Sequence, residues 1–138
     1  MKADLEALLA HQIRAIGLPA PARNYQFAAE AVGHGPGIKR RLAEAGLRNF
    51  QIDFCWPGIV IGKIGRREVR FGVEVDGLSP KGGGHQSIAG AKRDREKWLQ
   101  ALELGWVVLP VHGGQVKTGA AVNLIEQVLC PGKKRRLG

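Results

Sequence analysis

The chain has few cysteines, no long hydrophobic run and a shortage of acids. Cys55 and Cys130 are its only cysteines, and neither lies in a CxxC or Cys/His spacing. We therefore expect no structural zinc site, but two reduced and buried thiols. No apolar run approaches the roughly 18 residues that a membrane span needs. The first residues carry acids where an export signal would be apolar, so we expect a cytoplasmic protein that binds no membrane.

Acids are outnumbered, with 12 Asp and Glu against 21 Lys and Arg, which gives a net charge of +9. Excess positive charge attracts polyanions, and nucleic acid is the commonest such partner. Charge does not separate DNA from RNA, but three Trp, one Tyr and four Phe are too few to favour recognition by base stacking. The predicted phosphate-binding residues are Lys39, Arg40, Arg41, Arg66, Arg67, Lys81, Arg93, Lys133, Lys134, Arg135 and Arg136.

Periodicity predicts an α/β protein with one domain over residues 1–130 and a flexible basic tail over 131–138. A strand is also possible around Tyr25, and a short basic helix over 38–46. The main elements are predicted as a helix over 3–16, an antiparallel meander of strands over 49–56, 58–64 and 68–77, a helix over 87–105, a strand over 106–112, and a helix over 118–129. This α-βββ-α-β-α order predicts a central mixed sheet flanked by helices.

The helix predicted over 87–105 has an apolar side. That side carries Ile88, Ala91, Trp98, Leu99 and Leu102, and we expect it to face the core. Lys97 falls roughly opposite, which predicts a position facing solvent or DNA. Lys92 lies nearer the apolar edge.

Two strands carry acids that point to metal chemistry. Glu74 and Asp76 lie two residues apart and so share one face of their strand. If the strand carrying Asp53 pairs with it antiparallel, three carboxylates converge. Converging carboxylates repel one another unless a cation lies between them. Mg²⁺ favours such oxygen ligands together with substrate phosphate, and Mn²⁺ is its expected substitute. A solvated acidic sheet face is the alternative.

The segments "RNFQIDFCWP", "VEVDG", "DREKW" and "LGWVVLP" resemble the PD-(D/E)xK nuclease superfamily, especially its small phage and prophage endonuclease-domain proteins. Those proteins are similar to very-short-patch mismatch nucleases and Holliday-junction resolvases. The resemblance implies a restriction-endonuclease-like core in which Asp53, Glu74 and the carbonyl of Val75 hold the metal. It also implies that Glu6 is an additional acidic residue of the site, and that a phage-encoded chain would act in a bacterial host.

Asp76 departs from that family, because it stands where most members have lysine. A carboxylate there would act as a second metal ligand or as a base toward water. The missing ammonium group could instead come from Lys92 or Lys97 on the next helix. His85 could contact phosphate or move a proton, or it could be an ordinary exposed histidine.

Together these features predict a Mg²⁺-dependent DNA endonuclease that prefers branched DNA, as a Holliday-junction resolvase does. Cutting two opposed strands needs two sites, which predicts a symmetric homodimer. The alternatives are a mismatch or restriction-type nicking nuclease, a non-catalytic DNA-binding module on a degenerate nuclease scaffold, and a protein directed at RNA.

Overall fold

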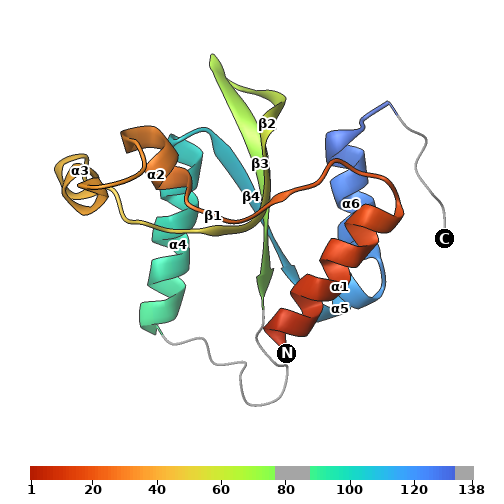
Figure 1. The fold of residues 1–138 in the computed structure, drawn as a ribbon. Coiled ribbons are helices and arrows are strands. Elements are labelled where there is room, and N and C mark those ends of the chain that lie inside the picture. Colours follow the sequence, from red (N-terminus) through yellow and green to blue (C-terminus); the bar gives the residue numbers. More distant parts are fainter. Residues whose placement is uncertain (77–87, 133–138) are drawn as a thin grey trace.

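A computed structural model describes residues 1–76 and 88–132 as three layers, with a sheet between two groups of helices (Figure 1). The first group is α1 (Lys2–Ala15), α5 (Gly113–Lys117) and α6 (Ala120–Leu129), and the second is α2 (Phe27–Val32), α3 (Ile38–Glu44) and α4 (Ile88–Glu103). The strands are β1 (Ala22–Tyr25), β2 (Ile52–Ile64), β3 (Arg67–Asp76) and β4 (Trp106–His112). Among the described residues, no helix has the length and apolar character to cross a membrane.

The four strands lie in the order β1-β2-β3-β4. The first three are antiparallel, and β4 pairs parallel to β3 after the crossover through α4. The protein is therefore a mixed α/β structure with a mixed sheet flanked by helices, as predicted. The predicted meander was assigned to the wrong segments, however, because residues 49–56 and 58–64 do not form two strands. The meander consists of β1, β2 and β3.

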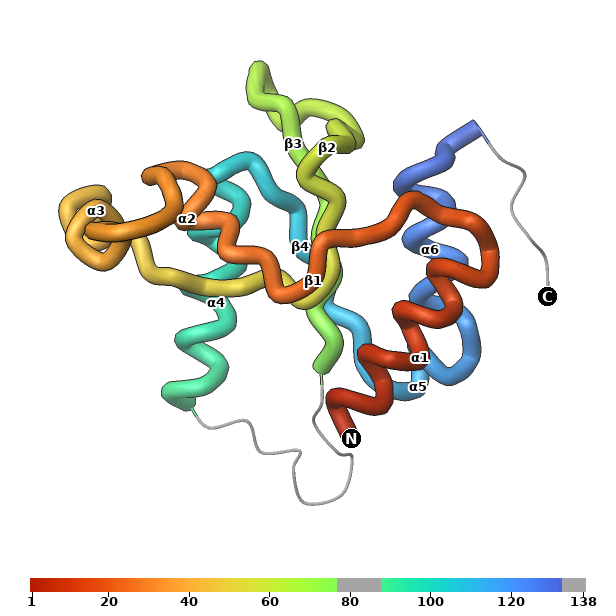
Figure 2. The backbone as a smooth tube through the Cα atoms, in the orientation of Figure 1, coloured from red at the N-terminus to blue at the C-terminus, as the bar shows by residue number. Residues whose placement is uncertain are grey.

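Pro57 explains that error. Proline normally ends a strand because it cannot donate a ladder hydrogen bond. Here the pairing of β2 with β3 shifts register between Cys55 and Val60, so Pro57 lies in an irregular stretch where no ladder donor is needed. The strand continues beyond it, and the far ends of β2 and β3 form a hairpin that extends past the helices (Figure 2).

Apolar side chains form a separate core on each face of the sheet. The larger core lies under α1 and α6 and includes Leu9, Ile13, Phe54, Val73 and Ile125, all fully or almost fully buried. The smaller core faces α2 and α4, and its buried members are Phe27, Phe50, Ile52, Cys55, Ala101 and Trp106. Burial of apolar area on both faces holds the three layers together.

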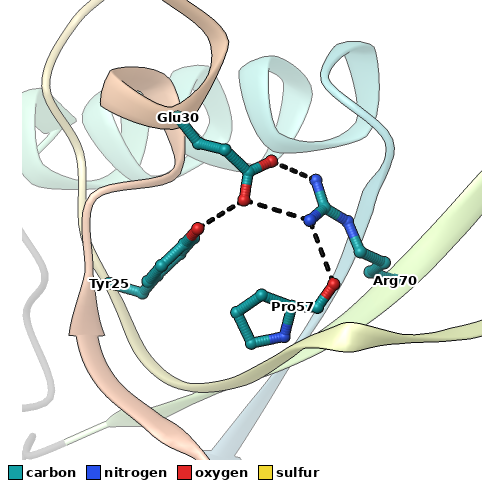
Figure 3. A network of polar contacts seen from close by, with 4 residues as sticks. All are labelled: Tyr25, Glu30, Pro57 and Arg70. Carbon is teal, nitrogen blue, oxygen red and sulfur yellow. Dashed lines mark hydrogen bonds and ion pairs between the residues drawn. The ribbon is translucent and has the colours of Figure 1, made fainter. Parts of the chain in front are cut away.

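A polar network joins α2 to the sheet on the face of the smaller core (Figure 3). The Glu30 carboxylate accepts hydrogen bonds from the Tyr25 hydroxyl and from both terminal nitrogens of Arg70. Arg70 also donates to the carbonyl of Pro57 at 3.2 Å and lies over the ring of Trp106 at 4.2 Å. Burial, and then the hydrogen bond to Glu30, raise the pKa of Tyr25 to about 12. The network connects α2 with β1, β2 and β3.

Helix α6 matches the helix predicted over 118–129, except that it begins after Gly119 and not after a Thr118 cap. The short helix α5 before it was not predicted. Gly119 has a φ of +85°, a conformation that side-chain-bearing residues rarely adopt. The hydroxyl of Thr118 still accepts a weak hydrogen bond from the amide of Ala120, at 3.4 Å.

Candidate active site

Two carboxylates from paired strands lie close to the edge where β3 and β4 end. The antiparallel register joins Phe54 to Val73, so Asp53 and Glu74 occupy the next positions along the two strands. The start of α1 lies near the same edge (Figure 1), and Lys2 of that helix forms an ion pair with Asp53. The start of α1 and the paired strands β2 and β3 therefore meet here, at the C-terminal ends of the parallel strands β3 and β4, where α/β proteins commonly bind ligands.

Asp53 is held rigidly. The residue is 6% exposed, and its Oδ2 accepts a hydrogen bond from the amide of Val75 at 2.9 Å. The same oxygen lies 3.2 Å from Nζ of Lys2, whose side chain is about half exposed. A buried carboxylate is costly unless hydrogen-bonded and paired, and Asp53 has both kinds of partner. The hydrogen bond from Val75 therefore fixes the position of the Asp53 carboxylate, while the side chain of Lys2 can move toward solvent.

Glu74 forms an ion pair with Lys97, which projects from α4 to reach its Oε1. The side chains of Glu74 and Lys97 are only 13% and 18% exposed. Burial lowers the pKa of Lys97 to about 8, with Asp53 opposing the shift and Lys2 adding to it. Because Asp53 and Lys2 both influence Lys97, the four charged side chains form one electrostatic group, named the charge cluster below (Lys2, Asp53, Glu74 and Lys97).

The prediction that Lys97 faces solvent or DNA was wrong. Helix α4 turns Lys97, Gln100 and Ala101 toward the sheet. The residues expected in the core lie outside: Ile88 is 91% exposed, and Trp98, Leu99 and Leu102 are exposed as well. The buried Gln100 explains part of this orientation, because its amide exchanges two hydrogen bonds with the backbone of Arg48. Lys92, the other candidate, is exposed.

The other predicted acidic residues lie around the charge cluster. Glu6 lies one turn after Lys2 on α1, and its carboxylate is 3.6 Å from Arg23 of β1. Asp76 is the exposed last residue of β3 and, two residues after Glu74, belongs to the same face of the strand. Across residues 1–76 and 88–132, no three His, Cys, Asp or Glu side chains lie close enough together to hold a metal ion. The site is thus built on two carboxylates and two ammonium groups.

The predicted phosphate-binding residues have different surroundings. Arg41 donates to the carbonyls of residues 32, 33, 34 and 36, so it fastens the turn before α3. Arg67 donates to the carbonyls of Leu102 and Glu103, and Arg93 lies over the ring of Phe50. Arg40 pairs with Glu44, while Lys39 and Arg66 are exposed. The predicted residues Lys81, His85, Lys133, Lys134, Arg135 and Arg136 lie outside the described residues.

Lys2 is the member of the charge cluster that sequence reasoning missed. Its position at the start of the chain gave no reason to associate it with strands fifty residues away. The available signal was its spacing from Glu6, because residues four apart lie on the same face of a helix. A search for cations on the helical face of a suspected acidic residue would have found it.

A scan against protein-family models gives no match, and searches of curated proteins and of solved structures find none either.

Proposed function

We propose that this chain is a Mg²⁺-dependent nuclease that hydrolyses DNA phosphodiester bonds, built on a restriction-endonuclease-like core. The observation that carries the proposal is the placement of Asp53 and Glu74 on neighbouring strands at a sheet edge, with Asp53 bonded to the amide of Val75 and the largely buried ammonium of Lys97 beside Glu74. A net charge of +9 supports a polyanionic substrate.

The two carboxylates fit the needs of Mg²⁺, which usually binds one or two carboxylates together with waters and substrate phosphate. Asp53 and Glu74 would hold the ion, with the carbonyl of Val75 as a third oxygen ligand. A bound Mg²⁺ polarises a phosphate and lowers the pKa of a water that it binds. Lys2 is partly exposed, so it can leave Asp53 without a change in the fold.

Lys97 takes the place of the lysine that the PD-(D/E)xK resemblance led us to expect at position 76. Its ammonium is buried against Glu74, where a positive charge acts on phosphate more strongly than it would in water. The hydrogen bond from Val75 orients the carboxylate of Asp53. Asp76 is exposed at the end of the same strand, in a position to act on a water molecule or on a second cation.

Glu74→Gln tests the proposal, with Glu68→Gln on the exposed part of β3 as the matched control. Cleavage of a labelled four-way junction and of a linear duplex is measured in Mg²⁺, and DNA affinity is measured by fluorescence anisotropy in EDTA. We expect Glu74→Gln and Lys97→Met each to slow cleavage by at least about 100-fold, with affinity retained. Cleavage at the wild-type rate by Glu74→Gln would disprove the site.

The same assay tests the preferred substrate. Symmetric cuts near the branch, with none in the duplex, are expected of an enzyme selective for branched DNA. Such an enzyme is expected to be a homodimer, because it cuts two opposed strands, and sedimentation measures that state. Equal cutting of junction and duplex would favour the mismatch or restriction-type alternative.

One observation favours a second candidate, a DNA-binding module without catalysis. Both carboxylates already have ammonium partners, so the cluster is neutralised without a metal. For such a module, no DNA is cut in the presence of Mg²⁺ or Mn²⁺. Addition of either metal then leaves the DNA affinity of Glu74→Gln unchanged.

A further inference from the structure

A second feature lies on the same side of the sheet as α1, away from the charge cluster. The chain leaves α1 and folds back to reach β1 (Figure 2), and a cavity of about 300 Å³ lies in this bend. Ligand pockets in proteins begin at about that size. Its lining includes Ala10, Ile13, Arg14, Leu18, Pro21 and Arg23.

The cavity combines an apolar floor with two guanidinium groups. Ile13 and Leu18 are buried, and Pro21 adds a third apolar surface. Arg14 is exposed, and within the described residues its side chain has no hydrogen bond or ion pair. Arg23 lies over the ring of Phe54 at 4.2 Å, which fixes its position and leaves part of its planar donor set open. Flat apolar groups that carry a phosphate match this lining.

The cavity is connected to the charge cluster through α1. Lys2, Glu6, Ala10 and Arg14 are spaced by four residues, so each lies about one turn after the previous one along that helix. Arg23 lines the cavity and also lies 3.6 Å from Glu6. At 1.5 Å per residue, Arg14 lies about 18 Å from Lys2 along the helix, which equals roughly five base-pair steps of duplex DNA.

We infer that this cavity binds one unpaired nucleotide of the DNA, within about five nucleotides of the bond placed at the charge cluster. The phosphate lies on Arg14 and Arg23, and the base lies against Ile13, Leu18 and Pro21. The apolar lining offers a surface to the face of a base, and a base inside duplex has both faces stacked, so an unpaired base is favoured over duplex. The choice of DNA as the ligand rests on the proposed function. If the inference holds, the protein recognises unpaired nucleotides at a DNA branch.

The test measures DNA binding in EDTA, so it needs no catalysis. Three DNAs are compared by anisotropy: a duplex, the same duplex with one unpaired nucleotide, and that DNA with an abasic residue at the unpaired position. We expect the wild-type protein to bind the second about tenfold more tightly than the first, and to lose this preference with the abasic residue.

Ala20→Trp fills the cavity from an exposed lining position. We expect it to bind the duplex as the wild-type protein does and to lose the preference for the unpaired nucleotide. Arg14→Ala should lower the preference and reduce the salt slope of binding by about one. The matched control Lys117→Ala removes one positive charge at an exposed position of α5 and should keep the preference for the unpaired nucleotide.

Two results would overturn the inference: an unchanged preference in Ala20→Trp, or equal binding of the abasic and intact DNAs by the wild-type protein. Thymidine monophosphate provides a third arm, because tight binding of the free nucleotide without any DNA preference also contradicts it. Failure of the proposed function has a different signature. Glu74→Gln would then cleave normally, or no protein would cleave, while the anisotropy results stand.

Discussion

The two faces of the sheet are held by helices of opposite character. On one face, α1 buries Leu9 and Ile13 in the larger core, as an amphipathic helix is expected to do. On the other, α4 buries Gln100 and Ala101, turns Lys97 toward the sheet and leaves Leu99 60% exposed. The first helix is oriented by apolar burial, and the second by polar partners on the sheet and on the segment before β2. Hydrophobic periodicity therefore identifies the inward side of a helix only where the facing surface is apolar.

Replacement of one leucine on each helix should show the largest difference. Leu9→Ala removes a fully buried side chain and is expected to lower the free energy of unfolding by about 2–5 kcal/mol. Leu99→Ala is the matched control on α4 and should change it by less than about 0.5 kcal/mol. Urea denaturation followed by circular dichroism measures both. Similar losses in the two variants would mean that α4 packs with its apolar side inward.

Gln100→Ala tests what orients α4. The substitution removes a buried amide, leaves the backbone N–H of Arg48 without its partner and leaves the Arg48 carbonyl with only the amide of Phe50, so we expect a loss of about 1–3 kcal/mol. Gln51→Ala removes an exposed amide just before β2 and serves as the control. A loss no larger than that of the control would remove the polar explanation of the helix orientation.

The ion pair between Glu30 and Arg70 should contribute less. A double-mutant cycle with Glu30→Gln and Arg70→Met is expected to give a coupling of about 0.5–1.5 kcal/mol, because both side chains are partly exposed. The exposed pair of Arg40 and Glu44 on α3 gives the comparison, with an expected coupling below about 0.5 kcal/mol. Equal couplings would indicate that the network in Figure 3 does not fasten α2 to the sheet.

The side chains of Cys55 and Tyr25 on the face of the smaller core should make stability depend on pH above neutrality. Burial raises the pKa of Cys55 from 9.0 to about 12. The folded state therefore keeps a proton that the unfolded state loses, so stability is complete below pH 9.0 and falls as the pH rises from there toward 12. Tyr25 acts in the same direction between 10.0 and about 12. Urea midpoints at several pH values from 7 to 10.5 should show the decline, and Cys55→Ala should lack the part that begins near 9.

A thiol reagent compares the accessibility of Cys55 with that of Cys130 directly. Cys55 is buried, whereas Cys130 is partly exposed after α6. At pH 8 in native buffer, a disulfide reagent should label Cys130 quickly and Cys55 only after unfolding. Rapid labelling of both thiols without denaturant would show that the face carrying α4 opens readily.

The sequence by itself determined the mixed α/β class and the mixed sheet flanked by helices, but not the short helices α2 and α5. Alternation along the strands predicted that Asp53 and Glu74 would lie near one another, because a strand has only two faces and pairing decides which residues lie opposite one another. The function assigned to them remains a proposal.

Tertiary structure alone decided which cations reach those acids. Lys97 points inward against the helical pattern because Glu74 and the backbone of Arg48 offer α4 polar partners that local sequence does not reveal. Lys2 reaches Asp53 only because α1 packs beside the edge where β3 ends. Pro57 likewise fails to end β2, because a register shift removes the need for its missing donor. Each of these outcomes depends on contacts between segments distant in sequence, which local propensity cannot specify.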